Sequence, residues 1–93
     1  MKQPELPKYY GKSNTITDPV GAIKIKSIRV EDNGTIRKNY LVPKESGYEP
    51  IEVSDEFMLL ERPQLGGYYV ETSTPFQFYS AAAVFERLYE RTN

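Results

Sequence analysis

The sequence contains neither cysteine nor histidine, and these two absences exclude much of the common chemistry of protein sites. Without cysteine among its 93 residues, the chain has no disulfide bond and no thiolate nucleophile, which suits a reducing cytoplasm. Without histidine, it lacks the side chain that titrates nearest neutral pH and most often ligates metals. We therefore expect a protein that is not an enzyme and has no catalytic residue, metal site or cofactor.

The chain also lacks a strong net charge and a long apolar run. Its 12 basic and 13 acidic residues leave a net charge of −1, whereas nucleic acids and anionic membranes are bound by strongly basic surfaces. No apolar run approaches the roughly 20 residues of a transmembrane helix. The first seven residues lack the apolar region of a signal peptide. Neither a nucleic acid nor a membrane is an expected partner.

What is present is the composition of one small globular domain. Hydrophobic residues make up 39% and charged residues 27% of the chain, which is ordinary for a soluble domain. Residues 1–20 hold three prolines. Because proline neither continues a helix nor donates to a strand ladder, we expect an extended or partly disordered arm there, and a single α+β domain over residues 21–93. Tyr9 and Tyr10 in this arm pack either on the domain or on a partner.

A β-hairpin is predicted between Ala22 and Val42. β-branched and aromatic residues recur there with the period of two that is typical of strands. The turn formers Asp32-Asn33-Gly34 lie between the two runs. The first run changes phase at residues 26–27, which predicts a β-bulge. A three-residue loop then gives three cross-strand pairs on one face: Val30 with Ile36, Ile25 with Tyr40, and Ile23 with Val42.

The predicted hairpin is locally basic and is followed by a loop that carries a tyrosine. The cations form either a solvated sheet face or a surface for an acidic partner or a nucleic acid. They are Lys24, Lys26, Arg29, Arg37 and Lys38. Residues 44–50 are a loop with Tyr48 near its tip, either folded back on the core or exposed as an anchor. Residues 51–53 are too short to stand alone and would add an edge strand.

A short helix is predicted to begin after Ser54. The serine hydroxyl can accept from the free backbone amides of the first turn, and the two acidic residues that follow suit the positive end of the helix dipole. The helix is expected to end by Arg62, because Pro63 follows it. Three apolar side chains are expected to face the core from this helix: Phe57, Leu60 and, beside them, Met58.

The last third of the chain has the densest apolar and aromatic content, and it predicts a second hairpin that runs into a helix. The expected strands are residues 68–71 and 76–79, about a turn at 73–75, and Ser80 is expected to cap the helix. Because successive strand residues point to opposite faces, Tyr68 and Tyr69 cannot share a face. The helix carries an apolar stripe of Val84, Phe85 and Leu88.

The predicted fold is therefore α+β, with a mainly antiparallel sheet of about four strands from two hairpins. A short helix lies between the hairpins, and a C-terminal helix packs on one face of the sheet. A bare second face would favour a homodimer. The candidate protein-binding residues are exposed aromatic anchors and cations of the basic hairpin: Tyr9, Tyr10, Lys24, Lys26, Arg37, Tyr48 and Tyr69.

Four stretches between residues 53 and 89 carry a recognisable pattern. They are Val53-Ser54-Asp55-Glu56-Phe57, Pro63-Gln64-Leu65-Gly66-Gly67-Tyr68-Tyr69-Val70, Ser80, and Phe85-Glu86-Arg87-Leu88-Tyr89. In this pattern the chain resembles the C-terminal part of a family of small proteins encoded by tailed bacteriophages and prophages, a family without an established biochemical activity. It departs from the family where Ser73-Thr74-Pro75-Phe76 replaces a Glu-Asp-Gly-Tyr turn and where Ala81 replaces a proline at the helix start. The resemblance implies a phage or prophage accessory protein in the cytoplasm of the infected bacterial host, and it carries over no catalytic residue.

The expected function is the binding of a host or phage protein, with inhibition of a bacterial defence or regulatory system as its purpose. The eight tyrosines support this prediction, because tyrosine covers a large area at low entropic cost. Two alternatives stay open. One is a sponge that sequesters a small nucleotide signal in an aromatic pocket, with cations supplied by the basic hairpin. The other is a minor virion or assembly component.

Overall fold

The computed structural model describes residues 5–16 and 18–91, and this part of the chain forms seven strands and two helices. The predicted α+β class with an antiparallel sheet is confirmed, but the expected number of four strands is wrong. The three strands outside the two predicted hairpins have only three or four residues, too few to show a period of two in the sequence. In chain order the elements are β1 (Lys8–Gly11), β2 (Val20–Asp32), β3 (Arg37–Pro43), β4 (Ile51–Val53), α1 (Asp55–Glu61), β5 (Tyr68–Glu71), β6 (Gln77–Ser80), α2 (Ala82–Leu88) and β7 (Tyr89–Arg91).

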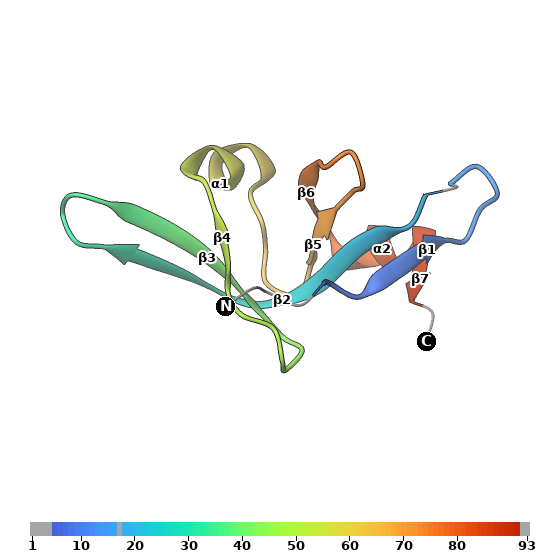
Figure 1. Cartoon of the computed structure of the whole chain (residues 1–93), viewed down its shortest axis with the longest axis horizontal. Coiled ribbons are helices and arrows are strands. Elements are labelled where there is room, and N and C mark those ends of the chain that lie inside the picture. The colour runs from blue at the N-terminus through green and yellow to red at the C-terminus, as the bar shows by residue number, and fades with distance from the viewer. Residues whose placement is uncertain (1–4, 17, 92–93) are drawn as a thin grey trace.

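β2 is the strand around which the molecule is built. Its C-terminal half pairs with β3, while its first residues pair with β1 on one edge and β5 on the other. The strand order is β4-β3-β2-β1-β7, and β6 is attached through β5. Because one long strand joins both ends, the molecule is elongated, 48 × 28 × 24 Å, and the β2–β3 hairpin projects at one end (Figure 1).

Two hydrophobic clusters lie on the two faces of β5. Tyr68 belongs to the first cluster with Phe85 of α2, and Tyr69 belongs to the second with Leu41 of β3. The two adjacent tyrosines therefore point to opposite faces, as predicted. Both are buried, because α2 covers one face of β5 while β3, β4 and side chains of α1 cover the other.

The β2–β3 hairpin has the predicted bulge but a longer loop than predicted. The pairing shifts between residues 25 and 27, where the change of phase in the sequence placed the bulge. The loop spans residues 33–36 instead of 32–34, because the Asn33 side chain closes it. The Oδ1 atom of Asn33 accepts from the amides of Thr35 at 3.0 Å and Ile36 at 2.8 Å.

This longer loop changes the register of the hairpin and exchanges the two faces of β3. The partner of Val30 moves from position 36 to Asn39, a shift of three residues, and an odd shift exchanges the two faces of a strand. Asn39 and Leu41 consequently point to the core, while Tyr40 lies on the other face beside Arg29. The other two predicted pairs are wrong for the same reason and are replaced by Ile25 with Pro43 and Ile23 with Tyr69 of β5.

The short middle helix matches the prediction at its ends but not on its surface. Ser54 caps it, with its Oγ accepting from the Phe57 amide at 3.0 Å. The helix ends at Glu61, and Arg62 takes the left-handed conformation before the proline. The expectation that Leu60 faces the core is wrong, because Leu60 is 70% exposed and α1 has no buried residue.

The C-terminal unit matches the prediction in its hairpin and departs from it in its helix. β5 has the predicted bounds and β6 begins one residue later. Ser80 does not cap α2, because Ser80 belongs to β6 and Ala81 is the N-cap. The helix stops at Leu88, since the next three residues pair with β1 as β7. Within the expected stripe only Phe85 is buried, and Val84 and Leu88 are exposed.

The segment expected to be an N-terminal arm contributes a strand to the sheet. Residues 8–11 form β1, which lies between β2 and β7. The ring of Tyr9 meets those of Phe85 and Tyr68 edge to face, at 5.0 and 6.0 Å between centroids. Tyr9 therefore packs on its own domain. Positions 1–4 and 17 of the expected arm lie outside the described residues.

Candidate protein-binding surface

The tyrosines proposed from the sequence as partner anchors occupy different parts of the molecule. Tyr69 is only 2% exposed and its hydroxyl donates to Glu71 at 2.8 Å, so its burial removes it from the set of surface anchors. Tyr9 lies in the aromatic cluster with Phe85, and Tyr48 packs against the second core cluster. Tyr10 on β1 is exposed, and it is the one of these four that offers a free ring.

The cations proposed from the sequence are partly neutralised. The Nζ of Lys24 is 3.6 Å from Oε2 of Glu86. Arg37 lies with its Nε 3.7 Å from Oδ1 of Asp55. Lys26 is exposed and makes no ion pair within the described part of the chain. None of these three cations lines one of the hollows found among the described residues.

A hollow between α1 and the β5–β6 turn has exposed apolar side chains on both walls. Leu60 of α1 is 70% exposed, and Phe76, just before β6, is 59% exposed. The hollow measures about 410 Å³, and its apolar lining is completed by Phe57 and Pro75. α1 and the β5–β6 turn rise from the same side of β2 (Figure 1). We call this hollow the α1–β6 groove.

The polar lining of the α1–β6 groove is acidic. Glu56 and Glu61 line it from α1, Gln77 lines it from β6, and no lysine or arginine is among the lining residues. The four groove-facing residues of α1 follow the helical period, with Leu60 four positions after Glu56 and Glu61 four after Phe57. Leu59 on the neighbouring face is equally exposed, at 69%, but does not line the groove.

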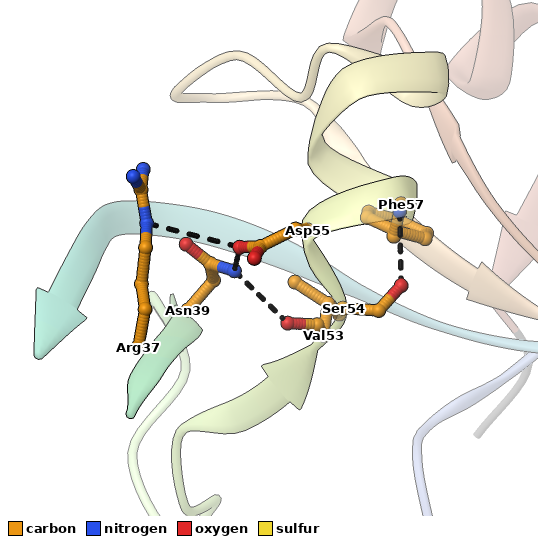
Figure 2. A network of polar contacts seen from close by, with 6 residues as sticks. All are labelled: Arg37, Asn39, Val53, Ser54, Asp55 and Phe57. Carbon is orange, nitrogen blue, oxygen red and sulfur yellow. Dashed lines mark hydrogen bonds and ion pairs between the residues drawn. The ribbon is translucent and has the colours of Figure 1, made fainter. Parts of the chain in front are cut away.

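A polar network fixes the start of α1 and so positions one wall of the groove (Figure 2). The Nδ2 of Asn39, on β3, donates to Oδ1 of Asp55 at 2.6 Å and to the carbonyl of Val53 at 3.4 Å. Arg37 approaches the same Asp55 oxygen, and Ser54 caps the first turn. Asn39 is 2% exposed, and its Oδ1 has no hydrogen-bond partner among the described residues.

The other wall of the groove is fixed by hydrogen bonds of the β5–β6 turn. The amide of Phe76 donates to the Thr72 hydroxyl at 2.9 Å, and the Thr72 amide donates to the Phe76 carbonyl at 2.8 Å. The Tyr79 amide donates across to the Glu61 carboxylate at 2.9 Å. This last bond ties β6 to α1 and sets the spacing of the two walls.

The perturbed pKa values lie away from the groove and have structural causes. Burial, together with its hydrogen bond to Glu86, raises the pKa of Tyr68, and burial with its bond to Glu71 does the same for the pKa of Tyr69. The hydrogen bond from Tyr68 lowers the pKa of the Glu86 carboxyl. Both tyrosines therefore stay protonated and act as donors within the core.

The side chains of the groove can contact a partner in three ways. Its apolar side chains can be covered by a partner, its two carboxylates can meet cations, and Gln77 supplies amide groups. No cluster of three or more carboxylates suited to a metal ion occurs in residues 5–16 and 18–91. In the same part of the chain, no helix is long and apolar enough to cross a membrane.

The sequence contained one signal for this surface. Phe57, Met58, Leu59 and Leu60 are four consecutive apolar residues in a seven-residue helix. One face of so short a helix can bury only about half of them, so at least one had to be exposed. Phe76 gave no comparable signal, because its exposure depends on the geometry of the β5–β6 turn.

Comparisons of this chain with protein-family models, with curated proteins and with solved structures found no match. The resemblance to the phage and prophage family therefore stays a prediction from the sequence.

Proposed function

We propose that this chain is a non-enzymatic binding protein that engages a partner protein through the α1–β6 groove. The observation that carries the proposal is the pair Leu60 and Phe76, which face one hollow from two walls while most of their surface is in water. Apolar side chains gathered around a hollow and rimmed by polar groups are typical of protein interaction sites. Val84 and Leu88 on α2 are also exposed, but they flank none of the hollows described here.

The biological setting that we propose is that of a phage or prophage accessory protein. Its partner would be a host or phage protein in the cytoplasm of an infected bacterium, and binding would inhibit a defence or regulatory system. The support for this setting is the sequence resemblance over residues 53–89. The balanced charge of −1 supports a protein partner over a nucleic acid.

The geometry gives less support to the alternative function, a sponge for a small nucleotide. Three other hollows of the molecule are lined by carboxylates. Two share Glu5 and Glu71, with Lys8 in one and Glu52 in the other, and the third has Glu31 and Asp32 beside Lys38. Carboxylates repel the phosphates of a nucleotide at short range. Tyr68 and Phe85 are buried against each other with 4.5 Å between centroids. Tyr40, which lines the third hollow, already has the Arg29 guanidinium over its ring at 4.9 Å.

The proposal is tested by affinity capture from bacterial lysate with three baits: the wild type, Leu60→Glu and Leu59→Glu. The two leucines are adjacent on α1 and equally exposed, but only Leu60 lines the groove. We expect at least one protein that the wild type and Leu59→Glu retain and that Leu60→Glu loses by about tenfold or more in quantitative mass spectrometry. Equal recovery on all three baits would exclude the groove as the binding surface.

A further inference from the structure

β6 is an edge strand whose outer backbone groups face the α1–β6 groove. Among the strands of residues 5–16 and 18–91, it pairs only with β5. The amide of Tyr79 points away from β5, since it donates to the carboxylate of Glu61 on α1. Backbone groups two residues apart in a strand point to the same edge, and the β5–β6 register runs without a shift through this stretch. Gln77, which lines the groove, therefore also directs its N–H and C=O into it.

The groove combines this open edge with a particular set of side chains. Leu60 and Phe76 offer apolar contact on either side of Gln77, and Glu56 and Glu61 place two carboxylates on the α1 wall. An extended chain presents side chains alternately to its two sides. Its apolar residues would therefore meet Leu60 and Phe76, while a neighbouring cation would meet the carboxylates.

We infer that the partner contributes an extended segment with a lysine or arginine beside an apolar residue, and that this segment adds a short strand to β6 at Gln77. The inference rests on the proposed function of the groove and specifies what the groove binds. Main-chain hydrogen bonds to an exposed edge give affinity, and side-chain pockets give specificity, in this mode of peptide recognition. The amide of Tyr79 already donates to the Glu61 carboxylate, so the added strand ends before Tyr79.

The other occupants fit this surface less well. A partner helix has its own backbone groups paired, so it would cover Gln77 and leave its N–H and C=O without partners, which is costly in a buried interface. The edge strands of a second copy are β4, β7 and β6 itself. β4 and β7 carry Glu52 and Glu90, and β6 brings its own groove with Glu56 and Glu61. These residues would meet the carboxylates of the groove with like charge.

The test begins with a phage-displayed library of random dodecapeptides selected on the wild-type protein. Peptides that also bind Leu60→Glu are removed, and the consensus peptide is synthesised and measured by fluorescence polarisation. We expect alternating apolar residues with at least one lysine or arginine. The dissociation constant should rise by about tenfold or more in Leu60→Glu and stay within about twofold in Leu59→Glu.

The backbone contact is tested with two substitutions at one position. Gln77→Pro removes the outward amide, which an edge strand tolerates, whereas Gln77→Ala removes the side chain and keeps the amide. We expect the dissociation constant to be about tenfold higher with proline than with alanine, because both variants lack the glutamine side chain and only proline lacks the amide. N-methylation of alternate amides of the consensus peptide applies the same test from the ligand side and leaves the protein unchanged.

Each alternative outcome overturns a stated part of the account. A groove-dependent consensus that is acidic or helical, or that tolerates both Gln77→Pro and N-methylation, overturns the extended basic segment and leaves the proposed function standing. Self-association of the wild type that Leu60→Glu abolishes would make a second copy the occupant and overturn the inference. If no selected peptide depends on Leu60, both the inference and the proposed groove fail.

Discussion

α1 and α2 have the same length, seven residues, and are held in place in different ways. α1 has a side-chain cap at Ser54 and no buried residue. α2 has no side-chain cap and is anchored by Phe85, which is 1% exposed. The ring of Phe85 stacks between those of Tyr68 and Tyr89, at 4.5 and 4.9 Å between centroids. α1 is thus held by polar contacts at both ends and by the partly buried Phe57 and Met58, and α2 by one fully buried ring in its middle.

The difference shows how a small domain can use one helix for stability and another for binding. A helix anchored by its apolar side chains uses them in the core and leaves little for a partner. A helix anchored at its end by a cap and a network, as α1 is by Ser54 and Asn39, can leave apolar side chains such as Leu60 in water. We therefore assign α2 to the stability of the domain and α1 to recognition.

Phe85→Ala should produce the largest change. Removing a fully buried aromatic side chain takes about 3–5 kcal/mol from the free energy of unfolding, which approaches the whole stability of a small domain. Urea denaturation followed by circular dichroism measures this loss. Val84→Ala on the same helix is the control and should change the free energy of unfolding by about 0.5 kcal/mol or less, because Val84 is half exposed. Equal losses in the two variants would contradict the anchor role of Phe85.

Asn39→Ala should have an intermediate effect that falls mainly on α1. It removes the hydrogen bonds that hold Asp55 and the Val53 carbonyl, and the loss of a buried polar contact costs about 1–3 kcal/mol. Hydrogen exchange by mass spectrometry should show faster exchange in α1 than in the wild type, with little change in α2. Uniformly faster exchange would mean that Asn39 supports the whole domain and not α1 in particular.

Removing the side-chain cap of α1 and adding one to α2 should change the free energy of unfolding by smaller amounts, of opposite sign. Ser54→Ala removes the bond to the Phe57 amide and should lower the free energy of unfolding by about 1 kcal/mol. Ala81 already has the extended backbone of a cap residue, so Ala81→Ser should supply the missing acceptor and raise it by about 0.5 kcal/mol. Thermal unfolding of both variants measures the two shifts. A loss in Ala81→Ser would show that α2 has no place for a cap.

The smallest expected effect is on the free energy of unfolding at acidic pH, through Glu86 on α2. The pKa of Glu86 is lowered in the folded state, so its ionised form contributes stability that is complete above the ordinary pKa of 4.5 and is lost as the pH falls through the lowered value. Glu86→Gln should therefore flatten the decline in stability below about pH 4.5. Denaturation series at several pH values check this. Glu90→Gln, at an exposed position on β7, is the matched control and should keep the wild-type decline.

Local sequence rules predicted the parts of the fold that depend on local chemistry. The Ser54 cap, the helix end before Pro63, the bulge in β2 and the bounds of β5 all follow from residues within a few positions of each feature. The register of the β2–β3 hairpin could not be predicted in the same way. It depends on whether Asn33 closes a three- or four-residue loop, and the bonds that decide this form only in the folded turn.

The candidate site was less predictable because it depends on contacts between distant segments. Alternation along β5 correctly predicted that Tyr68 and Tyr69 point to opposite faces, and Tyr69 was proposed as an exposed anchor. The side chains that cover the face of Tyr69 come from β3, β4 and α1. Conversely, Leu60 has helical spacing typical of a core residue, but the polar network at the start of α1 orients it toward the groove. Neither outcome is encoded in the residues next to these positions.

The most direct test of the central claim is site-specific photo-crosslinking in living bacteria. A benzophenone amino acid is placed in turn at the positions of Leu60 and Leu59 on α1 and of Val84 on α2, all of which are exposed. The account predicts a discrete covalent product with a second protein from position 60, much less from position 59, and none from position 84. A strong product from position 84 with none from position 60 would contradict the assignment of recognition to α1 and of stability to α2.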